Sequence, residues 1–481
     1  MKFILNMTKT APEFYNELVE KFPFEPTISQ DSLIKKLAFF IFENNKEALF
    51  LIKGYAGTGK TTTISTVVNN LWRVGKKAVL LAPTGRAAKV ISGYSKKQAF
   101  TIHKKIYFPK KNKAGGVDFT LQPNKHSNTI FIVDEASMIP DTPTGSKLFE
   151  NGSLLDDLMS YVYSGVQCKL ILIGDTAQLP PVKLDISPAL DAQKLALNYN
   201  KEVTEIELNE VMRQHANSGI LINATELRLI LANNGFSDFQ FELGYPDLIR
   251  LIDGYEIEDA INTAYDNIGV EDTAFIVRSN KRANQYNQQI RSKIRGQENE
   301  ISTGDYVMVV KNNYYWLKDS SEAGFIANGD ICEILEIFNI KELYGYRFAE
   351  VKIRMIDYPN QKPFETVLLL DTLTSESPSL SYEDSNRLYH EVGKDFAHEK
   401  SKYKQLLGIK KSKYFNALQV KFSYAVTCHK SQGGQWKTVF IEQPYLPDGQ
   451  NVDYLRWLYT AVTRAQEKVY LIGFNDDFFK D

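Results

Sequence analysis

The run Gly54-Tyr-Ala-Gly-Thr-Gly-Lys60-Thr61 contains three glycines followed by a lysine and a hydroxyl residue. It follows the apolar run 48–52, which we expect to be a buried strand, and it precedes a predicted helix. In that setting, glycines let successive backbone N–H groups turn toward an anionic phosphate, and the helix N-terminus adds its dipole. The spacing G-x-x-x-x-G-K-[ST] between a strand and a helix therefore predicts a phosphate-binding P-loop. An ordinary glycine-rich turn is the alternative.

The same loop supplies side chains for a nucleoside triphosphate and its cation. Lys60 is expected to reach the β- and γ-phosphates, and the Thr61 hydroxyl is expected to ligate Mg²⁺. The predicted nucleotide contacts in the loop are Gly54, Ala56, Gly57, Thr58, Gly59, Lys60, Thr61 and Thr62.

A second apolar run, Thr129–Val133, ends in Asp134 and Glu135. A carboxylate at the end of a strand beside the P-loop strand can hold the Mg²⁺ that Thr61 also touches. The adjacent carboxylate can activate the attacking water as a general base. Such a pair taken alone is usually a solvated loop, but together with a P-loop it predicts Asp134 as a metal ligand and Glu135 as a catalytic base.

A third candidate segment, Gly174-Asp-Thr-Ala-Gln178-Leu-Pro-Pro181, also follows an apolar run. The Gln178 amide can donate a hydrogen bond to the γ-phosphate and relay a change in position without adding charge. We predict a catalytic role for Gln178 as a γ-phosphate sensor. A proline-stiffened surface loop fits this segment equally well when it is taken alone.

The composition is that of a multidomain globular protein without a strong overall charge. The chain has 481 residues, of which 43% are hydrophobic, and 57 Lys and Arg against 58 Asp and Glu give a net charge of −1. This length suggests roughly three domains of about 150 residues. The net charge excludes a uniformly basic nucleic-acid coat. Locally, residues 101–128 carry a net +5, residues 394–421 a net +6 and residues 236–272 a net −9.

Cysteine content and hydropathy indicate the compartment. Cys168, Cys332 and Cys428 are too few for a disulfide framework and too far apart for a CxxC metal site, which points to a reducing environment. Three consecutive apolar residues precede Asn6, too few for a signal peptide, and no stretch approaches about 18 apolar residues. We therefore expect a soluble, cytoplasmic protein with no membrane partner.

Apolar runs that alternate with helical stretches predict the architecture. These runs recur at residues 48–52, 78–82, 129–133, 170–173, 274–277, 438–441 and 468–472. Strands that alternate with helices form parallel sheets, so the expected fold class is α/β. Residues 304–423 break this rhythm with short β-rich pieces and then a polar, helix-prone stretch. We interpret them as an inserted domain.

The order and spacing of the motifs resemble superfamily-one helicases, specifically the branch of RecD-like and phage Dda-like enzymes. Besides the P-loop, Asp134-Glu135 and Gly174–Pro181, the matching elements are Gln30 in 27–30, residues 82–88, Thr101-Ile-His103, Arg213 in 208–214, Ala425–Gly433 and Arg464 in 459–465. They span roughly residues 27–475. One departure is Gln435, where many relatives carry a small hydroxyl or acidic residue.

The resemblance implies two RecA-like P-loop domains with parallel sheets, which share ATP between them. It also implies two insertions, a small β-hairpin that acts as a pin and an SH3-like β-rich module with a helical extension. The expected boundaries are an N-terminal helix in 1–25, the first RecA-like domain in 26–103 and 129–212, the pin in 104–128, the second RecA-like domain in 213–303 and 424–481, and the SH3-like insertion in 304–423.

The resemblance further implies roles for the residues that match its motifs. Gln30 would read adenine, and Gln432 would lie near the nucleotide. Arg213 and Arg464, the latter as arginine finger, would neutralise charge on the γ-phosphate as the domains close. The residues expected to contact DNA are Pro83, Thr84, His103, Thr427, His429 and Lys430, with Tyr107 and Phe108 of the pin as a wedge at the terminal base pair. A structural histidine at position 103 and a lysine-rich loop without a wedge are the alternatives.

The implied activity is that of an ATP- and Mg²⁺-dependent DNA helicase that moves along single-stranded DNA, with a 5′ to 3′ polarity taken from the resemblance alone. Single-stranded DNA and forked duplex DNA are the expected partners, and single-stranded-DNA-binding or repair proteins are further candidates. We expect a monomer to be active. Two rivals stay open: a DNA-stimulated translocase subunit of an exonuclease complex, and a P-loop ATPase switch that works without nucleic acid.

Overall fold

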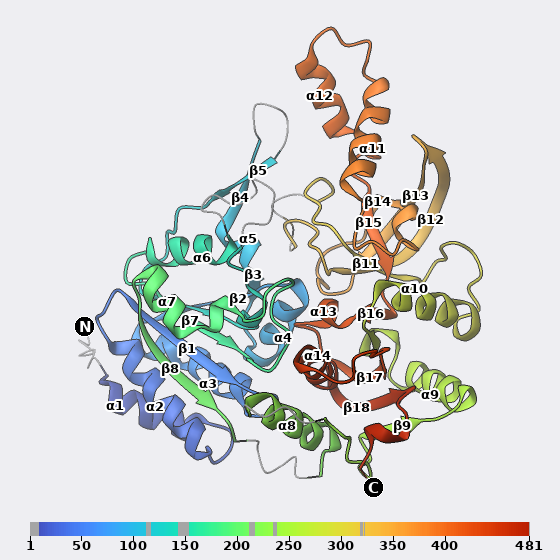
Figure 1. Ribbon diagram of the computed structural model, residues 1–481. Helices are drawn as coiled ribbons and strands as arrows, with labels where there is room; N and C mark the ends of the chain where they lie inside the picture. Colours follow the sequence, from blue (N-terminus) through green and yellow to red (C-terminus); the bar gives the residue numbers. More distant parts are fainter. Residues whose placement is uncertain are drawn as a thin grey trace. The chain divides into compact units, whose positions relative to one another are not determined.

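The computed structural model describes residues 9–111, 117–142, 153–210, 217–233, 238–317, 321 and 323–480. The chain divides into two units, the first built mainly from residues up to 235 and the second mainly from residue 236 onward. Figure 1 shows the helices and strands of both units. Each unit has its own parallel sheet, which confirms the predicted α/β class.

The first unit is built on a six-stranded parallel sheet with the strand order β3-β2-β6-β7-β1-β8. Successive side chains of a strand face opposite sides, so Phe50 and Ile52 enter one core while Leu49 and Leu51 enter the other. Apolar residues therefore run continuously along these strands. The strands are β1 (Ala48–Gly54), β2 (Lys77–Ala82), β3 (Ala99–Thr101), β6 (Thr129–Val133), β7 (Lys169–Gly174) and β8 (Glu202–Leu208).

Helices cover both faces of this sheet. Phe14, Leu33 and Val67, from the first three helices, enter one core, and Leu155 and Leu195 enter the other. The helices are α1 (Ala11–Lys21), α2 (Ile28–Phe42), α3 (Lys60–Asn70), α4 (Gly85–Ser95), α5 (Ile102–Ile106), α6 (Leu154–Tyr163), α7 (Ala192–Tyr199) and α8 (Gly219–Ala232), with short turns η1 (Leu71–Val74), η2 (Ala136–Met138) and η3 (Pro188–Leu190).

Helix α8 groups with the first unit, whereas the sequence placed the start of the second RecA-like domain at residue 213. Arg228 of α8 donates from Nη1 to the Asn209 carbonyl at 3.0 Å, and its guanidinium lies 4.5 Å from the centre of the Tyr55 ring. Both contacts join α8 to the end of β8 and to the P-loop. A hydrophobic pattern alone does not reveal which sheet a helix covers.

The second unit contains a five-stranded parallel sheet with the strand order β16-β10-β17-β18-β9. The strands are β9 (Leu248–Leu251), β10 (Thr273–Val277), β16 (Ala425–Thr427), β17 (Trp436–Glu442) and β18 (Ala465–Ile472). Its helices are α9 (Gly254–Asn267), α10 (Asn280–Gln289) with the π-helical turn η6 (Ile290–Ile294), α13 (Cys428–Ser431) and α14 (Val452–Val462), with 3-10 turns η5 (Val270–Asp272) and η8 (Asp476–Phe478).

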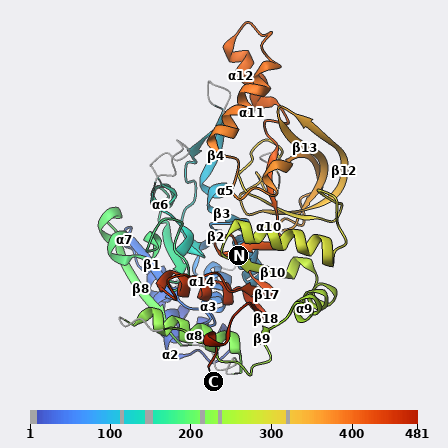
Figure 2. The same cartoon turned by 45° about the vertical axis from the view of Figure 1, so that its right-hand side comes forward.

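A closed β-barrel lies within the region where the sequence predicted a β-rich insertion. Its strands are β11 (Tyr306–Val309), β12 (Ile331–Leu343), β13 (Tyr346–Met355), β14 (Phe364–Leu369) and β15 (Leu418–Phe422). Between β14 and β15 the chain forms the turn η7 (Leu370–Thr372) and the helices α11 (Tyr382–Lys394) and α12 (Lys402–Lys411), which extend away from the barrel (Figure 2).

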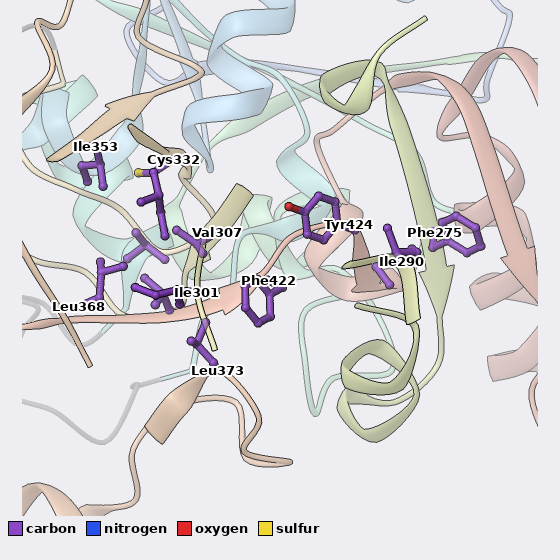
Figure 3. Close-up of a cluster of buried hydrophobic side chains, with 14 of the residues drawn as sticks. Phe275, Ile290, Ile301, Val307, Cys332, Ile353, Leu368, Leu373, Phe422 and Tyr424 are labelled. Carbon is purple, nitrogen blue, oxygen red and sulfur yellow. The ribbon is translucent and has the colours of Figure 1, made fainter. Parts of the chain in front are cut away.

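The barrel and the sheet of the second unit share one hydrophobic core. Figure 3 shows Phe422 and Tyr424 close to barrel residues such as Val307, in the same cluster as Phe275 of β10. A buried ion pair reinforces this junction, because Arg291 of η6 donates from Nε and Nη2 to the two oxygens of the Asp305 carboxylate, both at 2.9 Å. These contacts fix the barrel to the sheet.

Two further features complete the described fold. Strands β4 (Tyr107–Lys111) and β5 (Val117–Leu121) form a two-stranded sheet within the segment predicted as the pin. Among the helices in the described ranges, none combines the length and the apolar character needed to cross a membrane.

The Asp330 carboxyl group of the barrel leads to a prediction about pH. Its side chain is 1% exposed, and Oδ1 has no hydrogen-bond partner among the described residues. Burial, with a smaller effect of the Asp357 charge, raises the pKa of Asp330 to about 8. An unfolded aspartate has a pKa of about 3.9, so the proton that the folded state retains is lost on unfolding above that pH. The contribution of Asp330 to stability is therefore full below about pH 4 and is lost as the pH rises to about 8.

We expect Asp330→Asn to remove this pH dependence, because the amide stays neutral while its oxygen can still accept from the Ala327 N–H, now 2.7 Å from Oδ2. Thermal unfolding at pH 5 and pH 8 would test this. The melting temperature of the variant, relative to that of the wild type, should be a few degrees higher at pH 8 than at pH 5. The conversion is about 2–4 °C per kcal/mol. The same difference between the two proteins at both pH values would contradict the prediction.

Candidate nucleotide and nucleic-acid sites

The backbone of the P-loop requires glycine at defined positions. Gly57 and Gly59 have φ values of 75° and 78°, in the left-handed region that glycine adopts without strain. A Cβ on Gly54 would lie 3.0 Å from Cδ of Lys60 and 3.1 Å from Oγ1 of Thr58. Helix α3 begins at Lys60, and no side chain caps its N-terminus. Its first N–H groups are therefore suited to hold phosphate oxygens.

The Lys60 ammonium lies over this loop. Its Nζ atom donates to the carbonyl oxygens of Gly54 and Tyr55 at 2.6 and 2.7 Å. Thr61 and Thr62 follow in the first turn of α3 and are both half-buried. The arrangement fits a nucleotide, since the lysine can exchange its two carbonyl partners for phosphate oxygens. These contacts agree with the predicted roles of Lys60, Thr61 and Thr62 and leave the roles themselves as predictions.

Asp134 and Glu135 follow β6, and β7 lies between β6 and the P-loop strand β1. The prediction that their strand lies directly beside the P-loop strand was wrong, because sequence order does not fix strand order. The charge of Lys60 nevertheless affects the Asp134 carboxylate. Burial and the Glu135 charge raise the pKa of Asp134 to about 6, and the Glu135 N–H and the Lys60 charge partly oppose them. A half-buried carboxylate near the P-loop lysine is suited to hold a cation.

The backbone of Glu135 is strained. Its φ of 54° lies in the left-handed region, which residues other than glycine seldom occupy. The Glu135 N–H donates to Oδ1 of Asp134 at 2.9 Å, and its carbonyl accepts from the Met138 N–H at 3.1 Å. Strain of this kind persists where the surrounding structure enforces it, and it is concentrated at functional sites. The turn separates the directions of two adjacent carboxylates, which suits a metal ligand followed by a general base.

Gln178 lies beyond the end of β7 and is 7% exposed. Its Oε1 atom has no hydrogen-bond partner within the described part of the chain. Leaving a buried acceptor unpaired costs about 1–3 kcal/mol, so this position favours an incoming donor such as the attacking water. A Cβ on Gly174 would lie 3.1 Å from the Ser137 nitrogen, so the end of β7 closely approaches the segment after Glu135. This placement favours the sensor over the surface loop.

The Gln30 amide bonds to backbone groups of α2 and the P-loop. Its side chain is 1% exposed, its Nε2 donates to the Thr58 carbonyl at 3.0 Å, and its Oε1 accepts from the Thr27 N–H at 3.0 Å. Thr27 caps α2 and forms a capping box with Gln30, which turns the amide toward the backbone. In this structure the Gln30 amide joins the start of α2 to the P-loop, and its role in reading adenine stays a prediction.

The sequence did not indicate the partner of Tyr55. The Tyr55 hydroxyl donates to Oε1 of Glu207 at 2.6 Å, and burial together with this bond raises the pKa of Tyr55 to about 12. Nearby, a Glu210 carboxylate oxygen accepts from the Ser29 N–H at 3.2 Å and from its hydroxyl at 3.0 Å. These bonds join the P-loop and the start of α2 to the end of β8. Arg213 lies three residues after Glu210, outside the described residues.

Candidate residues of the second unit surround α13. Arg464 is 3% exposed and donates to the carbonyl oxygens of Thr460 and Gly434 at 3.0 and 3.3 Å. Gln432 is also buried and follows α13 directly. The guanidinium of Arg464 is therefore held in place by its own unit. Its role as arginine finger and the nucleotide contact of Gln432 stay predictions.

Three predicted DNA contacts lie at the start of α13. Thr427 ends β16, and its side chain makes no capping bond to the helix. His429 reaches solvent, and burial of part of its ring, followed by the charge of Arg278, lowers its pKa. Burial and the charge of Lys421 lower the pKa of Lys430 to about 8. At neutral pH the site thus presents a hydroxyl, a neutral imidazole and a lysine that is still largely protonated.

Two parts of the chain match known protein families. Residues 40–184, which contain the P-loop, Asp134 and Gln178, match an AAA domain. Residues 422–472, which contain Thr427 and Arg464, match a UvrD-like helicase C-terminal domain. The two matches cover the candidate residues of both units except Gln30 and Arg213.

Individual relatives point in the same direction. The ATP-dependent RecD2 DNA helicase of Deinococcus radiodurans is 32% identical over 174 residues, which cover 36% of this chain and 21% of that protein. The ATP-dependent DNA helicase dda of Enterobacteria phage T4 is 25% identical over 454 residues, which cover 88% of this chain and 93% of that protein. This chain is therefore similar to ATP-dependent DNA helicases. The resemblance indicated by the motif order is confirmed.

Among solved structures, the Pif1 helicase from Candida albicans aligns with 94% of this chain and 95% of its own chain. The sequence identity is 15% and the TM-score is 0.45.

Within the first unit, three predicted DNA contacts lie at or near the carboxyl ends of β2 and β3. Pro83 and Thr84 follow β2 and are half-buried. His103 lies in α5 with its ring 5.8 Å from the Tyr107 ring, and burial lowers its pKa to about 4. The imidazole is neutral at pH 7 and half-buried beside Tyr107, which fits the structural alternative, while the DNA contact of His103 stays a prediction.

The two aromatic residues predicted as the wedge have different surroundings. Tyr107 is 4% exposed, lies in the core of the first unit, and donates its hydroxyl to Oδ2 of Asp157 at 2.6 Å. Assigning Tyr107 to the wedge was therefore incorrect, because a ring held in this way cannot stack on DNA. Phe108 is 39% exposed and remains a candidate. The alternation of a strand explains the difference, since neighbouring side chains point to opposite faces.

We expect Phe108→Ala to slow the unwinding of a forked duplex by roughly 10-fold, because stacking on a base contributes about 1–3 kcal/mol. Single-stranded-DNA-stimulated ATPase should stay within about twofold, since the catalytic residues are unchanged. Tyr94→Ala is a matched control, because Tyr94 is an aromatic residue of the same unit that is 52% exposed. Equal losses of unwinding and ATPase activity in the Phe108 variant would argue against a wedge.

The basic segment 394–421 is only partly available to DNA. Lys394 pairs with Glu391 at 2.7 Å, and Lys413 pairs with Glu350 at 2.6 Å. Lys421 is 5% exposed and donates to the Thr372 carbonyl at 3.2 Å. These three lysines have structural partners. The interpretation of the segment as a DNA path stays a prediction for its other exposed lysines, Lys400, Lys402, Lys404 and Lys411.

Proposed function

We propose that this protein hydrolyses ATP to move along single-stranded DNA and to separate the strands of a forked duplex, with 5′ to 3′ polarity. The observation that carries the proposal is the carboxyl edge of the first sheet, where Lys60, Asp134, Glu135 and Gln178 follow strands β1, β6 and β7. The same chain carries the match to a UvrD-like helicase C-terminal domain. The relatives RecD2 and dda are named as ATP-dependent DNA helicases, which supports DNA as the polymer along which this protein moves.

The residues of the first unit would divide the hydrolytic work. The P-loop N–H groups and Lys60 bind and orient the phosphates. Glu135 accepts the proton of the attacking water, and the unpaired Oε1 of Gln178 accepts a hydrogen bond from that water. Thr61 and Asp134 would hold Mg²⁺, which supplies positive charge at the β- and γ-phosphate oxygens.

The second unit would supply positive charge to the γ-phosphate and would bind the DNA backbone. Arg464 is fixed by carbonyl groups of its own unit, so it can reach a γ-phosphate only through movement of that unit as a whole. We propose that this requirement couples hydrolysis to translocation. Arg213 would supply a second positive charge. Thr427, His429 and Lys430 would bind the backbone of the DNA, and the molecule would act as a monomer.

Duplexes that carry a single-stranded tail on either the 5′ or the 3′ side test the proposal. Strand release with MgATP from the 5′-tailed substrate and not from the 3′-tailed one is the expected result. Release from the 3′-tailed substrate alone would overturn the polarity. DNA-stimulated ATPase without strand release would favour the translocase subunit, and an ATPase rate unchanged by single-stranded DNA would favour the nucleic-acid-independent switch.

A further inference from the structure

The carboxyl edge of the second sheet places an arginine beside the predicted DNA contacts. Strands β10 and β16 are parallel neighbours, with Val277 in register with Thr427. Both strands end at these residues, so the next residue of β10, Arg278, follows at the same edge as α13. The sequence alone does not single out Arg278. Its relevance depends on the pairing of two strands that are about 150 residues apart.

The charge of Arg278 is not neutralised within its unit. The side chain is exposed, and no ion pair or hydrogen bond engages it among the residues that the structure describes. The nearest strand end on the other side of β10 carries Glu442, but Arg282 already holds that carboxylate through Nε at 3.0 Å and through Nη2. Glu442 also accepts from the Tyr286 hydroxyl at 3.2 Å. Two arginines thus lie near this edge, of which one is paired and one is not.

The groups around Arg278 are hydrogen-bond donors. The Thr427 hydroxyl is not used to cap α13, and His429 is the next exposed residue of that helix. After burial, the charge of Arg278 lowers the pKa of His429, in keeping with their positions at the same sheet edge. A guanidinium, a hydroxyl and a neutral imidazole can all donate to the oxygens of one phosphodiester.

The backbone that carries these donors is rigid. Asn287 of α10 is 2% exposed and accepts from the Ala425 N–H at 2.8 Å, while its Nδ2 donates to the Ala425 carbonyl at 2.9 Å. This pair of bonds fixes the start of β16, two residues before Thr427. The Ser279 side chain caps α10 immediately after Arg278. The edge is therefore preorganised, and a bound phosphate would not need to order it.

We propose that Arg278 binds a phosphate of single-stranded DNA and, together with Thr427 and His429, holds the DNA backbone on the second unit. This inference rests on the proposed function, because it names a further residue that contacts the same single-stranded DNA. Arg278 would act on DNA and not on ATP, so its removal should leave hydrolysis without DNA unchanged.

Binding of a fluorescently labelled oligo(dT) at several KCl concentrations tests the proposal. We expect Arg278→Ala to weaken binding by roughly 10-fold at low salt and to lower the salt slope by about 0.7, the value for one phosphate contact on a single strand. Arg278→Lys should recover most of the slope, because it keeps the charge. The DNA concentration for half-maximal ATPase stimulation should rise with the dissociation constant. Basal ATPase should stay at the wild-type level.

Arg282→Ala is the matched control, since Arg282 is a neighbouring, 46%-exposed arginine that is paired with Glu442. It should bind oligo(dT) within about twofold of the wild type. Wild-type affinity and slope in Arg278→Ala, or equal losses in both variants, would overturn the assignment of Arg278 while leaving the proposed function intact. A wild-type protein that neither binds oligo(dT) nor responds to it in ATPase assays would overturn the proposed function itself.

Discussion

Lys60→Ala is expected to reduce DNA-stimulated ATP turnover by roughly 10³ or more. Removing one preorganised donor from a site of charge development already lowers turnover by about 10²–10³, and Lys60 combines a donor with a full positive charge. The fold should survive, because the two bonds of its ammonium go to the Gly54 and Tyr55 carbonyls of the loop and not to the core. Steady-state phosphate release, together with thermal unfolding of the same sample, measures both effects.

Lys53→Ala is the control for the loss of a lysine at this position in the chain. Lys53 lies at the end of β1, one residue before the P-loop, and pairs with Glu205 of the neighbouring strand β8 at 2.5 Å. Its ammonium is engaged in an ion pair, so turnover should stay within a few-fold of the wild type. Near-normal turnover in Lys60→Ala, or an equal loss in both variants, would refute the assignment of the phosphate site to Lys60.

Features that depend on neighbouring residues were predicted from the sequence. The P-loop, the apolar strands before it and before Asp134, and the change of rhythm after residue 304 follow from local spacing and hydropathy. The position of Gln178 near the end of a strand was predictable for the same reason. The unpaired state of its oxygen was not, because that depends on which groups surround it in three dimensions.

Features that depend on contacts between distant residues were missed or assigned incorrectly. Strand β7 separates β6 from β1, and chain order does not encode that arrangement. We assigned Tyr107 to the wedge because aromatic residues adjoin lysines in its segment. Its hydroxyl, however, donates to Asp157 of α6, 50 residues away. Gln30 bonds to its own N-cap residue and to Thr58, which a match to a motif cannot reveal. Burial and hydrogen bonding are decided by tertiary structure.

Glu135→Gln is expected to bind ATP but to hydrolyse it more slowly by a factor of roughly 10² to 10⁴, the contribution of a positioned general base. Glutamine has nearly the same shape, so the left-handed backbone at φ 54° and the bond from its N–H to Asp134 should remain. The amide cannot accept the proton of the attacking water. Single-turnover hydrolysis, with nucleotide binding measured in parallel, separates loss of chemistry from loss of affinity.

The substitution also bears on the cation site, and this sharpens the test. The Glu135 charge is one of the causes that raise the pKa of Asp134, so removing it lowers that pKa and favours the ionised carboxylate. Cation and nucleotide binding should therefore not weaken in Glu135→Gln. Glu207→Gln is the matched control, because this carboxylate bonds to Tyr55 of the P-loop without facing the reaction, and its turnover should stay within several-fold. A Glu135→Gln variant that hydrolyses ATP at the wild-type rate, or one that loses ATP binding, would contradict the assignment of Glu135 as the base.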